Sequence, residues 1–96
     1  MIKHIVMFEF KSENRVANLQ LAKEMLEGLM GKVPTLRSME VGVNFSPETR
    51  AMDMSIITSF DDIEGLQSYA IHEEHLKVVA FIKEVTSSSK VVDYIY

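Results

Sequence analysis

The chain has 96 residues, of which 47% are hydrophobic and 25% are charged, so it fits one small globular domain over residues 1–96 and excludes a disordered chain. Its 14 acidic and 10 basic side chains give a formal net charge of -4 without a stripe of Lys and Arg, which argues against a nucleic-acid partner. There is no cysteine for a disulfide, a thiolate ligand or a thiol nucleophile, and no apolar run approaches the ~18 residues of a membrane span, so we expect a cytoplasmic protein.

The segment after Met1 predicts a strand. Residues 2–10 alternate with the period of two that a strand requires. One side carries Ile2, His4, Val6, Phe8 and Phe10, and the other carries Lys3, Ile5, Met7 and Glu9. His4 is therefore expected to point into the space beneath the helices, where an imidazole needs a hydrogen-bond partner.

A helix follows the first strand. Asn14 or Ser12 can cap it, and apolar residues recur at helical spacing from Val16 to Met30. Gly31 suits the position just past the helix, and Pro34 has no N–H to continue it. The sequence therefore predicts one amphipathic helix that packs on the sheet and ends before Pro34.

Two further strands are predicted at residues 36–45 and 52–60, joined by the polar connection 46–50. A connection of that length is typical of a hairpin, so the two strands should be antiparallel neighbours.

The second half of the chain predicts two helical stretches and a last strand. Asp61 or Asp62 can cap the first stretch, and the second runs from about residue 73 to residue 85. Residues 87–89 form a short polar linker, and residues 91–96, rich in β-branched and aromatic side chains, form the last strand.

The order βαββαβ predicts a ferredoxin-like α+β fold, in which two helices cover one face of a four-stranded antiparallel sheet. The open face carries large apolar side chains, and hiding them against a second copy is worth roughly a few kcal/mol. The sequence therefore predicts a homodimer that pairs sheet to sheet. The expected side chains are Ile5, Met7 and Ile57, with either Met39, Val41, Val43 and Phe45 or their more polar neighbours.

Short motifs along the whole chain resemble those of one family. They are Lys3 to Phe8 at the N-terminus, Val33-Pro34 after the first helix, Gly42 with Asn44, the run Tyr69-x-x-His72-x-x-His75, and Val92-Asp93-Tyr94 near the end. In this order and spacing the chain resembles the stress-responsive A/B barrel domain family, also called Dabb or dimeric α–β barrel proteins. The resemblance implies a homodimeric α/β barrel made from two ferredoxin-like sheets.

The candidate site consists of His4, Tyr69, His72, His75 and Asp93. Histidine exchanges protons near neutral pH, a tyrosine hydroxyl can hydrogen-bond a carbonyl oxygen, and a carboxylate can orient an imidazole. On a regular helix, the steps from Tyr69 to His72 to His75 keep all three side chains within an arc of about 120°. They are expected to line one pocket.

The resemblance also implies roles for these residues. In a plant member of the family, olivetolic acid cyclase, a tyrosine and a histidine that match Tyr69 and His75 cyclise a linear polyketide by aldol chemistry. Carried over, His75 would be the general base, Tyr69 would bind the substrate carbonyl, and His4 would line the pocket. Asp93 or a backbone carbonyl would fix the His75 tautomer.

The sequence is compatible with two functions, and neither needs a cofactor. The preferred one is a non-catalytic homodimer, stress-associated or binding a small hydrophobic or carbonyl ligand, whose histidines and tyrosine are hydrogen-bonded core groups. The alternative is a cofactor-independent cyclase, isomerase or lyase, which needs an open cavity that reaches His75 and Tyr69. Metal binding by His72 and His75 is disfavoured, because the zincin pattern needs histidines four residues apart.

Overall fold

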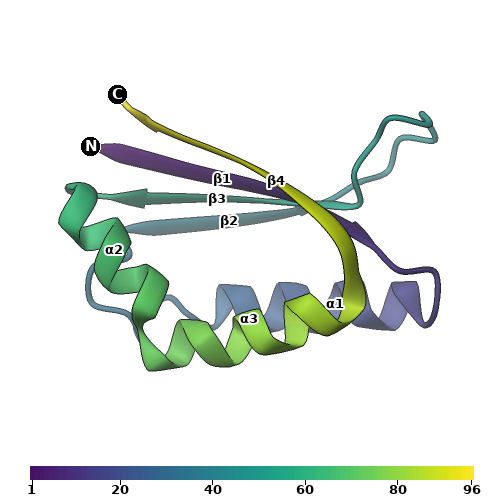
Figure 1. Ribbon diagram of the computed structural model, residues 1–96, viewed down its shortest axis with the longest axis horizontal. Coiled ribbons are helices and arrows are strands. Elements are labelled where there is room, and N and C mark those ends of the chain that lie inside the picture. Colours follow the sequence, from purple (N-terminus) through teal and green to yellow (C-terminus); the bar gives the residue numbers. More distant parts are fainter.

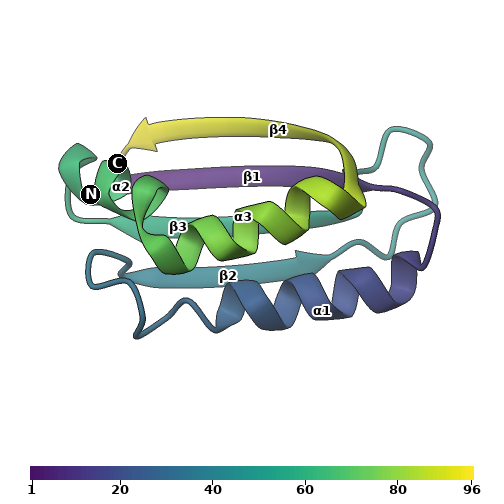
Figure 2. The same cartoon turned by 60° about the horizontal axis from the view of Figure 1, so that its bottom comes forward.

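The computed structural model describes all 96 residues and has the predicted ferredoxin-like architecture (Figure 1). The elements in chain order are β1 (Ile2–Phe10), α1 (Arg15–Glu27), β2 (Ser38–Val43), β3 (Met54–Phe60), α2 (Ile63–Ile71), α3 (Glu73–Val85) and β4 (Thr86–Ile95). The strands form one antiparallel sheet in the order β2-β3-β1-β4. All three helices lie on one side of this sheet (Figure 1, Figure 2).

The hydrophobic core lies between the sheet and the helices. Its buried strand residues include Met54, Ile56 and Phe60, and its buried helix residues include Ala22, Leu26, Tyr69, Val78 and Ile82. Register fixes which residues of β1 share this side, because Ile2 pairs with buried Phe60 and His4 pairs with buried Thr58. The predicted direction of His4, toward the helices, is therefore confirmed.

The last strand is longer than the sequence predicts. β4 begins at Thr86, so residues 87–89, predicted as a linker, belong to the strand, and Ser88 and Ser89 pair with Glu9 and Phe8 of β1. The hydroxyl groups of Ser87 and Ser88 donate hydrogen bonds to Glu9 Oε1 over 2.9 and 3.3 Å. These contacts between the two ends of the chain override the local preference of serine for turns.

The β2–β3 hairpin has shorter strands and a longer connection, residues 44–53, than the sequence predicts. Ladder pairing ends where the Asn44 N–H donates to the Asp53 carbonyl oxygen over 2.9 Å. The Asn44 side chain then forms a turn with Ser46, accepting from its N–H over 3.1 Å and donating to its carbonyl oxygen over 2.8 Å. The connection stands out on the side of the sheet away from the helices (Figure 1).

The helix ends agree only in part with the predicted caps. Asn14 precedes α1 with a left-handed φ of 51°, but its side chain makes no capping hydrogen bond. α1 ends at Glu27, earlier than predicted, and successive turns carry the chain to Gly31, whose φ of 86° suits glycine. Of the two aspartates proposed as caps, Asp62 caps α2 by accepting from the Gly65 N–H over 2.7 Å.

The face of the sheet away from the helices is called the outer face below. Met39, Val41 and Val43 pair with buried residues of β3, so these side chains share the helix side. β2 therefore gives the outer face its more polar set, Ser38, Glu40 and Gly42. The large apolar side chains of the outer face come from the other strands and are Ile5, Met7, Ile57, Val92 and Tyr94.

Candidate functional site

A cavity of about 250 Å³, called the helix-side cavity below, lies between α3 and the helix-facing side of the sheet. β1 contributes His4, Val6 and Phe8 to its wall, and α3 contributes His75 and Ile82 among others. Seven of its twelve lining residues are hydrophobic, so the cavity is mainly apolar with two imidazoles in its wall. Because α3 runs alongside β1 in the same direction (Figure 2), both imidazoles lie at the same end.

The His75 ring has a defined tautomer. Its Nδ1 lies 3.1 Å from the Ala70 carbonyl oxygen, and a carbonyl oxygen only accepts, so Nδ1 carries the proton. In the neutral ring the lone pair is then on Nε2, which makes no hydrogen bond within the protein. Burial lowers the pKa of His75, and the charges of His4 and His72 act in the same direction.

Tyr69 lies against His75 and is 1% exposed. The ring centroids of the two residues are 4.1 Å apart, and the His4 ring is edge-on to Tyr69 at 6.4 Å. The Tyr69 hydroxyl is buried and has no hydrogen-bond partner. Burial raises the pKa of Tyr69 to about 12, so the hydroxyl stays a donor at neutral pH. Tyr69 itself does not line the helix-side cavity.

His4 and Asp93 form a hydrogen-bonded pair across neighbouring strands. The two residues are directly opposite each other in the β1–β4 register, and His4 Nδ1 contacts Asp93 Oδ1. Opposed residues on one face of a sheet have Cβ atoms about 5 Å apart, which explains the contact. Of the two groups proposed to fix the His75 tautomer, the backbone carbonyl of Ala70 does so, while Asp93 orients His4.

His72 has a different place from the one predicted. It ends α2 and precedes α3, with an extended backbone at φ -65° and ψ 137°, so no regular helix runs from Tyr69 to His75. Its Nδ1 accepts from the Glu74 N–H over 3.1 Å and caps α3. His72 therefore does not line the helix-side cavity, and Tyr69 meets His75 across a break between two helices.

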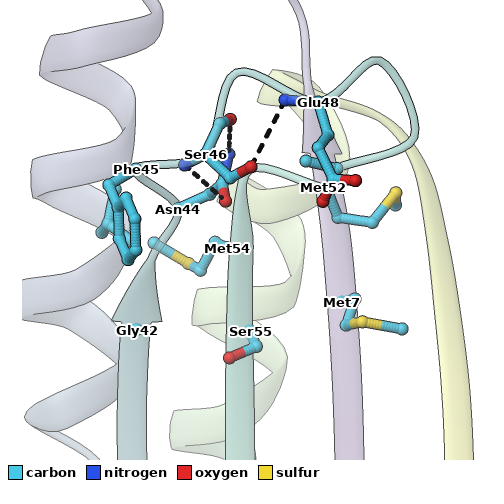
Figure 3. A pocket seen from close by; sticks show the side chains of 11 residues that line it. Met7, Gly42, Asn44, Phe45, Ser46, Glu48, Met52, Met54 and Ser55 are labelled. Atoms are coloured by element: carbon cyan, nitrogen blue, oxygen red, sulfur yellow. Dashed lines mark hydrogen bonds between the residues drawn. The ribbon is translucent and has the colours of Figure 1, made fainter.

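A second hollow, of about 350 Å³, lies where the β2–β3 connection meets the sheet (Figure 3). Met7 and Met52 are among its apolar walls, and Asn44 and Ser46 form its hydrogen-bonded rim (Figure 3). It is larger than the helix-side cavity, but Glu48 is its one titratable lining residue. The helix-side cavity, with His4 and His75 in its wall, is therefore the one of the two that has a pair of imidazoles.

Sequence patterns missed several parts of the site. Lys83, Thr86 and Ser89 also line the helix-side cavity, and no local motif marks them, because they meet only through the β1–β4 pairing and the path of α3. The Ala70 carbonyl is a backbone group and leaves no trace in a side-chain pattern. No group of three His, Asp or Glu side chains is arranged to hold a metal ion. None of the three helices combines the length and the hydropathy of a membrane-spanning helix.

Comparisons with known proteins agree with the fold and identify the family. An uncharacterised protein of Streptomyces coelicolor is 32% identical over 89 residues, covering 88% of this chain and 89% of that protein. A dimeric, ferredoxin-like protein of unknown function from Bacteroides fragilis has a TM-score of 0.91 at 28% identity, over 99% of this chain and 95% of that one. A hydroxynitrile lyase from Passiflora edulis has a TM-score of 0.88 at 14% identity, over 99% and 92% of the two chains. Residues 2–96 match the family model described as Stress Responsive A/B Barrel Domain, and the chain belongs to that family.

Proposed function

We propose that the helix-side cavity binds a small carbonyl compound and that His75 and Tyr69 catalyse proton transfer on it without a cofactor. The observation that carries the proposal is the buried Tyr69 hydroxyl, which has no partner although it belongs to a ring packed on His75. A purely structural core tyrosine would be paired, because an unpartnered buried polar group costs about 1–3 kcal/mol. In this proposal the hydroxyl donates to the carbonyl oxygen of the ligand.

His75 is the general base of the proposed reaction. Its lowered pKa favours the neutral ring at pH 7, and Nε2 then takes a proton from the carbon next to the carbonyl group. The electron pair of that C–H bond forms an enolate, whose oxygen accepts a hydrogen bond from Tyr69. The enolate carbon can attack a second carbonyl, take up a proton elsewhere in the molecule or expel a leaving group. These are the steps of a cyclase, an isomerase and a lyase.

The position of Tyr69 adds one requirement. Its hydroxyl is buried and Tyr69 does not line the cavity, so the wall beside His75 must widen when the ligand enters. His4 remains a wall residue at the same end, oriented by Asp93.

The common first step can be tested without knowing the natural substrate. Exchange of α-hydrogens for deuterium in small ketones dissolved in D2O, followed by proton NMR, measures proton abstraction directly. Wild type should accelerate exchange about ten-thousandfold, His75→Ala should abolish the acceleration, and Tyr69→Phe should reduce it by about a hundredfold. Tyr94→Phe, a change on the outer face, is the matched control and should leave exchange unchanged. Exchange that persists at the wild-type rate in both site variants would overturn the mechanism.

Homodimerisation is the second part of the proposal, with the outer face as the pairing surface. The Bacteroides fragilis relative is described as dimeric. The outer face carries an apolar row across three strands, in which Ile5 pairs with Ile57 on one side and Val92 on the other. The β2–β3 connection rises on the same side, and Phe45 at its start is 98% exposed. A second copy laid on this face would cover these side chains, which water would otherwise contact.

A further inference from the structure

We propose that the ligand of the helix-side cavity carries a carboxylate at the end remote from its carbonyl group, and that Lys83 and Ser89 bind this carboxylate. The inference rests on the proposed function, because it takes the His4 and His75 end as the place of the carbonyl. It adds the chemical class of the ligand, a medium-chain oxo acid.

The cavity has two polar ends at a defined separation. Along β1, His4 and Phe8 are four residues apart, and Ser89 of β4 lies opposite Phe8, which gives about 13 Å at the rise of a strand. Along α3, His75 and Lys83 are eight residues apart, which gives about 12 Å at the rise of a helix. Since α3 runs beside β1 in the same direction (Figure 2), both elements place the histidines at one end and Lys83 with Ser89 at the other.

The wall between these ends is apolar. Val6, Ile56, Val78 and Ile82 line it. A charged or strongly polar group in the middle of a ligand would lose its hydration there without gaining a partner. The middle of the ligand is therefore a hydrocarbon chain.

The remote end is exposed to solvent, and its donors on Lys83 and Ser89 have no carboxylate or other partner within the protein. Lys83 forms no ion pair within the protein, unlike Lys77 on the same helix, which pairs with Glu74 over 3.6 Å. The Ser89 hydroxyl makes no hydrogen bond, whereas the hydroxyl of Ser88 donates to Glu9. No Asp or Glu lines the cavity, so Lys83 is its one permanently charged lining residue. One ammonium and one hydroxyl match the charge and acceptors of a carboxylate.

The size of the cavity agrees with a medium-length chain. An apolar cavity of about 150 Å³ holds a molecule the size of benzene. The helix-side cavity, at about 250 Å³, has room for a longer chain but is smaller than the sites of most drug-sized ligands.

Three matched probes test the inference. They are 7-oxooctanoate, which has a ketone and a carboxylate, 2-octanone, which has the ketone alone, and octanoate, which has the carboxylate alone. Binding is followed by chemical-shift changes of the backbone amides in NMR titrations of the full chain. We expect 7-oxooctanoate to bind most tightly, and Lys83→Met to weaken its binding about five- to tenfold while leaving 2-octanone unchanged. Lys77→Met, on the same helix but outside the cavity, is the control and should change neither affinity.

The outcomes separate this inference from the function on which it rests. If both ketones bind equally and Lys83→Met affects neither, the carboxylate end is wrong while carbonyl binding stands. If neither ketone binds, the proposed function fails and the inference fails with it. A fall in the affinity of 7-oxooctanoate at higher salt, with 2-octanone unaffected, supports an ionic contact at the remote end.

Discussion

The ring of Tyr69 lies against the imidazole of His75 with 4.1 Å between the ring centroids, yet its hydroxyl group has no hydrogen-bond partner. Packing and hydrogen bonding of one side chain therefore have opposite effects on stability. The ring contributes buried apolar surface to the core, while the hydroxyl is desolvated without compensation.

Tyr69→Phe should therefore stabilise the protein. Removing an unpartnered buried hydroxyl and keeping the ring should raise the free energy of unfolding by about 1 kcal/mol. Urea unfolding at one fixed protein concentration measures this, with Tyr96→Phe, at the exposed end of the chain beyond β4, as a control that should be neutral within about 0.5 kcal/mol. A loss of stability in Tyr69→Phe would show that the hydroxyl has a partner in the folded protein.

The tautomers of two histidines are predicted by their acceptors. His75 faces a carbonyl oxygen and His4 faces a carboxylate, so each neutral ring should carry its proton on Nδ1. Long-range nitrogen–proton NMR spectra above pH 7.5 distinguish the two ring nitrogens directly. In Asp93→Ala, His4 should lose its preference for this tautomer while His75 keeps it. A proton on Nε2 of His75 in wild type would contradict its role as a base at that atom.

Stability should fall on mild acidification because of His75. Its pKa in the folded protein lies below the ordinary value of 6.5, so below about pH 6.5 the unfolded chain binds more protons at this residue than the folded one. The contribution is fully present above pH 6.5 and is lost as the pH falls toward the lower folded-state value.

Comparing urea unfolding at pH 7.5 and pH 5.5 isolates this contribution. The difference between the two pH values should be smaller in His75→Gln than in wild type, because the variant cannot titrate at that position. An equal difference in both proteins would mean that a group other than His75 accounts for the acid sensitivity.

The outer face should determine oligomeric state. Sedimentation at micromolar concentration should give about twice the chain mass of 10.9 kDa for wild type. Ile57→Glu, which puts a charge at the middle of the apolar row, should give a monomer. Ile71→Glu is the control, because Ile71 is 76% exposed at the end of α2, away from the sheet. Equal dissociation of both variants, or a monomeric wild type, would place the interface elsewhere or remove it.

Most of what the sequence could predict follows from the alternation of side chains along each strand. Alternation in residues 2–10 placed His4 on the helix side and Ile5 on the outer face, because successive side chains of a strand point to opposite faces. The same argument left β2 open, since both of its parity sets contain plausible surface residues. The pairing of Val41 with buried Ile56 shows which set faces the helices, and that register depends on contacts between distant parts of the chain.

Of the five candidate residues, only His4 and His75 line the helix-side cavity. Tyr69 and His75 do lie together, but the chain between them breaks at His72, whereas the prediction assumed one regular helix. The pairing of Asp93 with His4 depends on the β1–β4 register, which also includes an irregularity between Glu9 and Phe10. Such pairings follow from tertiary contacts and cannot be deduced from spacing along one segment.

The residues of β1 alternate between the helix-side cavity and the outer face. His4, Val6 and Phe8 form the wall of the helix-side cavity, while Ile5 and Met7 between them belong to the outer face. A strand with one face in water tolerates substitution at every second position. With the outer face paired as proposed, neither series of alternate β1 residues faces water, so a substitution scan from His4 to Phe8 should find that every position is sensitive. Ligand selectivity and self-association would then be constrained to change together over evolutionary time.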